Sequence, residues 1–170
     1  MSVKIQDKDK GFRKLVESMG ELGTITIGVQ GDEAKQKHPE SDLTVGEIAA
    51  IHELGLGGTP RRSWLVEWMD ANRDRMRNET ADALRQVLQG RISRNKALAA
   101  LGFAWTADVR ERVSSGQVTP GLPSSNPRGA GAPPLFDTHT LHNAITYKIY
   151  VPQARSIKNR TQRSVINRKK

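Results

Sequence analysis

Apolar and polar residues alternate in two short stretches that lie far apart along the chain. In residues 24–29 every second side chain is apolar, and the same holds for residues 144–151. This alternation is typical of β-strands with one buried face. The apolar positions are Ile25, Ile27 and Val29 in the first stretch and Ile145, Tyr147, Ile149 and Val151 in the second. Because a sheet of two strands is only marginally stable, a third strand from residues 30–43 or from a neighbouring subunit would complete it.

Helical spacing of apolar residues predicts four helices, over residues 12–19, 44–54, 63–89 and 95–115. Thr44 and Glu47 have the T-x-x-E spacing of a capping box at the start of the second helix. Ser63 is a suitable N-cap for the third helix. Glycines follow all four segments and are expected to end them.

The remaining segments predict loops. Residues 30–43 are polar and contain a proline, residues 117–134 are rich in Pro, Gly and Ser, and residues 137–141 favour a turn or short helix. The whole pattern predicts an α+β fold, with a small antiparallel sheet packed against three to four helices, one of them long. An extended Pro/Gly-rich loop or arm and a basic C-terminal arm complete it. We expect residues 1–152 to form a single domain and residues 153–170 a tail.

Composition and charge narrow the function classes. The chain has no cysteine, which excludes disulfides, thiolate zinc sites and cysteine nucleophiles. It has no run of about 18 apolar residues, so we expect no membrane-spanning segment and no membrane partner. The formal net charge is +9, and only +2 of it lies in residues 1–152. The other positive charges form a tail without acids: Arg155, Lys158, Arg160, Arg163, Arg168, Lys169 and Lys170. Such a block indicates either a solvated end or an arm that contacts nucleic acid or an acidic protein surface.

Two histidine motifs are candidates for chemistry. His52-Glu53 resembles half of the H-E-x-x-H zinc motif, but Leu56 occupies the position of the second histidine. His139 and His142 have a spacing that metals use on helices, yet no third ligand is evident nearby. No nucleophile elbow and no phosphate-binding glycine loop occurs. The sequence therefore predicts no catalytic residue, no metal site and no cofactor.

Two tryptophans follow the glycine-rich break after residue 54. Trp64 and Trp68 lie close to Arg61 and Arg62. Core packing is the usual role of tryptophan, but Trp and Arg are also enriched in subunit interfaces. We therefore treat Arg61, Arg62, Trp64 and Trp68 as candidate subunit-interface residues.

The order of these pieces resembles a known family. The strand TITIGV, the stretch TVGEIAAIHELGLGGTPRRSWL, the helix ALAALGFAWTADVRERVSSG and the final PPLFDTHTLHNAITYKIYV follow one another. They are similar to segments of the virion-morphogenesis, tail-completion and neck proteins of tailed bacteriophages. The resemblance covers about residues 12–152. Two positions depart from the family pattern: His139 stands where a glycine often follows Asp-Thr, and Ser63 stands before the aromatic Trp64.

The resemblance implies a structural virion protein of the phage neck or tail end, and not an enzyme. Such a protein forms a homo-oligomeric ring, of six or twelve subunits, that completes the tail and joins it to the DNA-filled head. Its partners would be portal- or adaptor-side neck proteins and tail-terminator or tail-tube proteins. Its location would be the virion neck, and the host cytoplasm during assembly.

A different class of function remains open from the charge pattern. The basic tail could make the chain a nonspecific nucleic-acid-binding module, which would also contact genomic DNA in a virion. This alternative predicts salt-sensitive DNA binding that is lost when the chain is truncated after Pro152. A metal-dependent enzyme using His52 or the His139 and His142 pair is the third hypothesis, tested by elemental analysis for bound metal.

Overall fold

The computed structural model describes residues 23–122, 125–126, 132–135 and 139–151. The chain divides into two units, of which one comprises Ile25–Ile149 and holds the helices and nearly all of both strands. The other unit consists of Met1–Thr24 and Tyr150–Lys170 and lies almost entirely outside the described residues. The predicted helix 12–19, the basic tail and part of the loop 117–134 therefore lie outside the described residues as well.

The two predicted strands form and pair with each other. They are β1 (Thr24–Val29) and β2 (Ile145–Tyr150), which make an antiparallel sheet of two strands. The side-chain amide of Gln30 donates from Nε2 to the Thr146 carbonyl oxygen at 3.4 Å and so bridges the two segments. Within the described residues no third strand joins them, and residues 30–43 contribute only an isolated bridge between Lys37 and Thr44.

The sequence predicted a loop over residues 30–43. That prediction is wrong in part, because a short helix, α2 (Asp32–Lys35), lies within the segment. Gly31 precedes this helix at a φ of 77°, a left-handed value that favours glycine. The helix packs against α3 at Gly46, where an added Cβ would approach the Ala34 carbonyl oxygen to 2.9 Å. A helix of one turn has no detectable apolar period, so only its packing partner accounts for it.

Helix α3 (Val45–Leu54) forms as predicted. Thr44 accepts a hydrogen bond at its side chain from the Glu47 backbone N–H, while the Glu47 carboxylate accepts from the Thr44 backbone N–H at 2.7 Å. The Thr44 backbone N–H, together with the Thr44 hydroxyl at 2.8 Å, donates to the Glu47 carboxylate and lowers the pKa of Glu47 below its usual value. Gly55 ends the helix in the left-handed conformation, with its N–H bonded to the Ile51 carbonyl.

The predicted helix 63–89 is two helices, α4 (Val66–Ala71) and α5 (Arg73–Leu88). Asn72 separates them, with φ −107° and ψ 10°. Its side-chain amide donates to the Trp68 carbonyl oxygen at 2.8 Å. An asparagine side chain that bonds to nearby backbone competes with helix continuation, which explains the break. The spacing of apolar residues cannot predict a helix break that involves a single residue.

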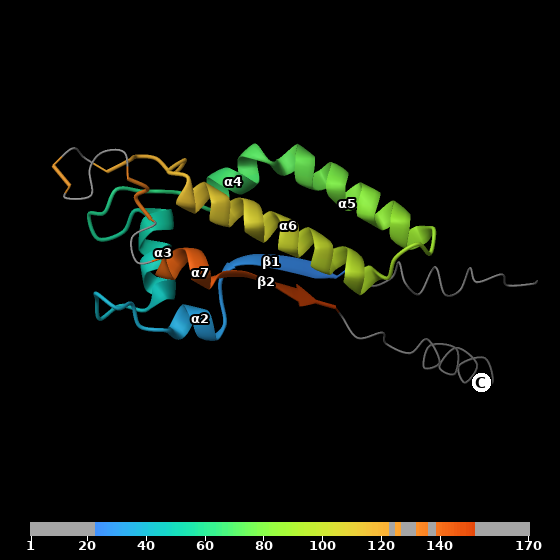
Figure 1. Cartoon of the computed structure of the whole chain (residues 1–170), viewed down its shortest axis with the longest axis horizontal. Helices are drawn as coiled ribbons and strands as arrows, with labels where there is room; N and C mark the ends of the chain where they lie inside the picture. Colours follow the sequence, from blue (N-terminus) through green and yellow to red (C-terminus); the bar gives the residue numbers. More distant parts are fainter. Residues whose placement is uncertain (1–22, 123–124, 127–131, 136–138, 152–170) are drawn as a thin grey trace, which may run out of the picture. The chain divides into compact units, whose positions relative to one another are not determined.

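Helix α6 (Arg94–Ser114) is the longest element and agrees with the predicted helix 95–115 to within one residue. Figure 1 shows it between α5 and the sheet, and it packs directly against α5. The short helix α7 (Thr140–Ala144) leads into β2, partly overlapping the predicted turn or short helix. Gly102 of α6 touches the Tyr147 ring of β2 so closely that any added Cβ would clash. The sheet thus rests on a glycine of α6.

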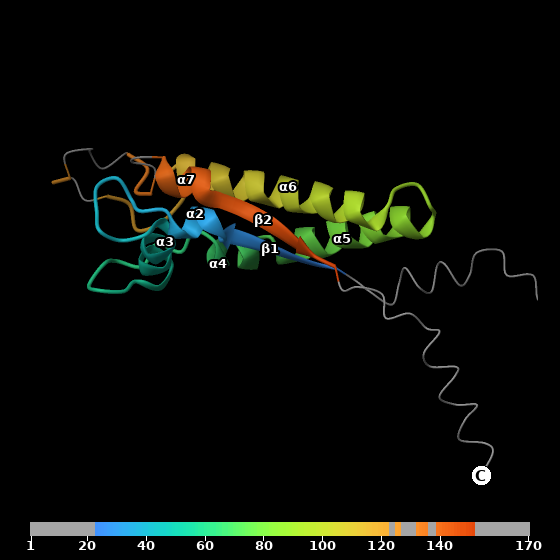
Figure 2. The ribbon, with the colours of Figure 1, turned by 90° about the horizontal axis from the view of Figure 1, so that it is seen from below.

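One hydrophobic core joins these elements. Trp64, Trp68 and Trp105 are buried in it with side chains from α3, α6, α7 and the start of β2. Figures 1 and 2 both show β1 and β2 side by side. The arrangement confirms the predicted α+β class with a small antiparallel sheet and one long helix. None of the described helices has the length and apolar character needed to cross a membrane.

Candidate functional site

The connection from α3 to α4, residues 53–66, is called the elbow here, and Glu53 organises it. The Glu53 carboxylate accepts three backbone N–H groups, from Trp64 and Leu65 at 3.0 Å each and from Val66 at 3.2 Å. It also accepts the Ser63 hydroxyl at 2.5 Å. One carboxylate thus receives four hydrogen bonds from the start of the next helix.

These contacts explain the acid of the His52-Glu53 pair. The first turn of a helix leaves backbone N–H groups without intrahelical partners, and a carboxylate there is favoured by the helix dipole. Glu53 supplies this carboxylate to α4 from the last turn of α3. Ser63 adds to the same turn by accepting the Glu67 backbone N–H at 3.1 Å. Glu53 is therefore a capping residue, and its four bonds leave it engaged in structure.

The two arginines of the elbow also bond to its backbone. Arg61 is exposed, and its Nε donates to the Glu53 carbonyl oxygen at 3.1 Å. Arg62 is only 7% exposed. Its Nε donates to the Pro120 carbonyl oxygen at 2.9 Å, and its backbone N–H donates to the His52 carbonyl oxygen at 2.7 Å. Arg62 therefore ties the elbow to the segment that follows α6.

The tryptophans predicted at a subunit interface lie inside the chain's own core. Trp64 and Trp68 are 3% and 4% exposed. Trp64 Nε1 donates to the Ala49 carbonyl oxygen at 3.2 Å, and the guanidinium of Arg75 lies 5.9 Å from the centre of the Trp68 ring. Their burial, and that of Arg62, is complete without a neighbour. Of the four candidate interface residues, only Arg61 is exposed, and the interface role of all four stays a prediction.

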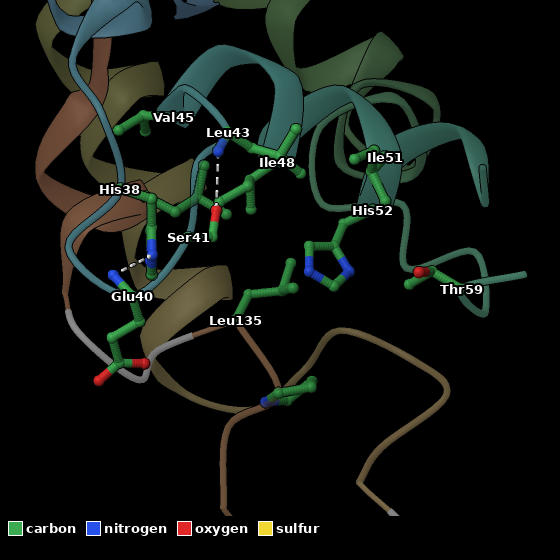
Figure 3. A pocket seen from close by; sticks show the side chains of 12 residues that line it. His38, Glu40, Ser41, Leu43, Val45, Ile48, Ile51, His52, Thr59 and Leu135 are labelled. Carbon is green, nitrogen blue, oxygen red and sulfur yellow. Dashed lines mark hydrogen bonds between the residues drawn. The ribbon is translucent and has the colours of Figure 1, made fainter. Parts of the chain in front are cut away.

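A pocket of about 390 Å³ lies between α3, the segment 38–43 and Leu135 (Figure 3). His52 lines it, and its buried Nδ1 has no hydrogen-bond partner among the described residues. Burial, aided by the positive charge of Arg62, lowers the pKa of His52. The imidazole is therefore favoured in its neutral form, which suits a packed histidine.

The chemistry available in this pocket is sparse. Among the described residues that line it, the only carboxylate belongs to Glu40, which in the view of Figure 3 points away from His52. The backbone N–H of Glu40 donates to His38 Nδ1 at 3.2 Å, so that imidazole organises its own loop. Within the described residues no three His, Asp or Glu side chains come together as metal ligands. The expectation of no metal site stays a prediction for the whole chain.

The second histidine motif lies at α7. His139 precedes this helix at a φ of 58°, and His142 lies within its single turn. The His142 Nδ1 lies 3.0 Å from the Asn143 side-chain oxygen. His142 thus has a protein partner beside it, and no acidic side chain completes a ligand set in the described part of the chain.

Sequence reasoning missed the role of Glu53, although a signal was present. An acid in the last turn of a helix faces the negative end of the helix dipole, which is unfavourable unless the acid has partners elsewhere. The glycines at 55, 57 and 58 then let the chain turn back sharply. An acid at the end of a helix, followed by a glycine turn and a serine, is therefore the sequence pattern that could have predicted the capping role of Glu53.

Comparison with known proteins returns no relative. No protein-family model, no curated protein and no solved structure matches this chain. The functional argument therefore depends on the residues and their geometry.

Proposed function

We propose that this chain is a structural protein of the neck or tail end of a tailed bacteriophage, which assembles into a ring that completes the tail and joins it to the head. The proposal takes its class from the order of sequence segments described above. The portal- or adaptor-side proteins and the tail terminator or tail tube are its proposed partners. The basic tail would bind acidic faces of those partners or the genomic DNA.

One structural observation carries the argument for self-assembly. The sheet of the described residues has only two strands, so each strand has one edge without a strand partner. Open edges of this kind recruit strands from other chains unless a protein protects them. A sheet this small is marginal alone, and a neighbouring subunit would complete it.

The character of the elbow supports a structural role. Three of its polar side chains form hydrogen bonds within the chain: the Glu53 carboxylate, the Ser63 hydroxyl and the buried guanidinium of Arg62. A catalytic acid must be able to reach a substrate and exchange a proton. A carboxylate that holds four donors of its own chain is unsuited to that task. We therefore propose that the chain is not an enzyme.

Mass photometry of the full chain, alone and mixed with the neck proteins of the same phage, tests the proposal. We expect closed oligomers of six or twelve subunits, visible as rings by cryo-electron microscopy. A chain that stays monomeric both alone and with those partners would overturn the ring. Salt-sensitive DNA binding by such a monomer, lost on truncation after Pro152, would instead support the nucleic-acid-binding alternative.

A further inference from the structure

A groove of about 380 Å³ runs between α6 and β2. It is lined by Phe103, Thr106 and Arg110 of α6 and by Thr146 and Tyr147 of β2, among others. Consecutive residues of a strand point to opposite faces of a sheet. Because both Thr146 and Tyr147 line the groove, it follows the edge of β2 and not one of its faces.

The outward side of β2 can be identified from hydrogen bonds. In an antiparallel pair, successive residues turn their backbone groups alternately toward and away from the partner strand. The Ile145 carbonyl oxygen accepts Arg110 Nε of α6 at 3.0 Å, so it faces the groove. Tyr147 and Ile149 follow at even spacing and share this orientation. Within the described residues, no backbone hydrogen bond outside the β1–β2 ladder reaches either of them.

Two side chains that line the groove lack contacts that a protein interior would normally supply. Phe103 is 71% exposed, the largest value among the exposed large apolar side chains of the described residues. Thr106 is 5% exposed, and its buried hydroxyl has no hydrogen-bond partner in the described part of the chain. An open strand edge, an exposed phenyl ring and an unpaired hydroxyl therefore meet at one place.

We propose that this groove, the β2 groove, is the site where a second copy of the chain adds its β1 strand to the sheet. The inference rests on the proposed ring and names the surface that would build it. The incoming strand would bond to the backbone groups of Tyr147 and Ile149. Its apolar face would cover the Phe103 ring.

The β1 strand of a neighbour is the occupant that fits, because it is the other open strand edge in the described residues. Each copy then offers one β2 groove and one β1 edge, a head-to-tail contact that closes into a ring when the rotation permits. The apolar side chains of β1, Ile25, Ile27 and Val29, are only partly buried in their own copy. These side chains retain apolar surface that can contact the Phe103 ring of the neighbouring copy.

Photo-crosslinking of the full chain tests this pairing. Benzoylphenylalanine replaces Phe103, and the matched control carries it in place of Leu54, which is 62% exposed in the elbow. Isotopically labelled and unlabelled copies are mixed, and crosslinked peptides are identified by mass spectrometry. We expect crosslinks between copies from position 103 to residues 24–29. Crosslinks from position 103 to any other segment, or none between copies, would overturn the proposal.

A charge variant gives a second readout. Phe103→Glu should weaken assembly at least tenfold, about 1.4 kcal/mol, whereas Leu54→Glu should leave it unchanged. Because both positions are exposed, we expect each variant monomer to remain folded. Thermal unfolding of each variant checks this. Rings that form equally well with Phe103→Glu would refute the β2 groove and leave the proposed function standing. If position 103 crosslinks to residues 24–29 but the copies never form a closed ring, the β2 groove would be supported and the ring refuted.

Discussion

The elbow and the β2 groove handle polar groups in opposite ways. In the elbow, the Glu53 carboxylate accepts the exposed donors at the start of α4, and Arg62 is bonded at both its side chain and its backbone. In the groove, the Thr106 hydroxyl has no partner among the described residues, and no backbone group outside the β1–β2 ladder bonds to the backbone of Tyr147 or Ile149 there. Within the part of the chain that the structure describes, these polar groups of the elbow have partners, whereas those of the groove do not.

This difference predicts that the elbow determines the stability of the single chain, whereas the groove determines its assembly with other copies. Buried polar groups without partners cost free energy, so proteins retain them where something else supplies the partner or where function requires it. Changes in the elbow should therefore affect the unfolding of the isolated chain. Changes at the outer side of the groove should affect contacts between chains. The predictions below begin with the largest expected effect.

Glu53→Ala should cause the largest loss of stability, about 3 kcal/mol. It removes the acceptor of three backbone N–H groups and of the Ser63 hydroxyl. Urea unfolding of the full chain measures the effect. Glu40→Ala, at an exposed position, serves as the control and should change stability little. Equal stability of the two variants would show that the carboxylate does not hold the elbow.

Gly102→Ala should destabilise the chain by about 2 kcal/mol, because the added methyl group meets the Tyr147 ring. The same substitution at an open helical site would normally be stabilising. Thermal unfolding distinguishes the two results. The double variant Gly102→Ala with Tyr147→Ala provides the check, since removing the ring should cancel the clash. An increase in stability for the single variant would mean that the sheet can lift away from α6.

His52 should make stability depend on pH. Its pKa is lowered in the folded chain, so the unfolded chain binds the proton more readily. The stabilising contribution is present above the unfolded pKa of about 6.5 and is lost as pH falls through the folded value. Replacing His52 by Asn should flatten the difference in unfolding free energy between pH 7 and pH 5. His142→Asn is the matched control, and an identical change in both variants would exclude His52 as the cause.

Thr106→Val should have the smallest effect and the opposite sign. It replaces a buried hydroxyl that lacks a partner with a methyl group of similar size, and we expect a gain of about 1 kcal/mol. Differential scanning calorimetry of the monomer measures the gain. Val109→Thr supplies the reverse change at a fully buried site of the same helix and should destabilise. A loss of stability for Thr106→Val would show that the hydroxyl has a partner in the monomer.

Local patterns predicted the elements well where a single segment carries the signal. The alternation in β1 and β2, and the capping box of Thr44 and Glu47, all appear in the structure as predicted. The break at Asn72 and the helix α2 were missed, since each depends on a side-chain bond or a packing partner that periodicity does not record.

The candidate site was less predictable for a related reason. Trp64 and Trp68 suit a core and an interface equally well by composition, and only their burial distinguishes the two. The sequence places Glu53 beside His52, and this neighbour suggests half of a metal site. Its real partners lie 10 to 13 residues further along, beyond the glycine turn. The β2 groove unites α6 with β2, a pairing that no local pattern reveals.

The spacing of those partners has a consequence for how the chain folds. The elbow closes through contacts between residues near in sequence, whereas Gln30 and Thr146, which bridge the two strand segments, are 116 residues apart. Short loops close faster and at lower entropic cost than long ones, so we expect the elbow to form early and the sheet late. The edge of β2 then comes into existence only when both ends of the domain have met. A chain could offer that edge to a neighbour only after its synthesis has passed β2.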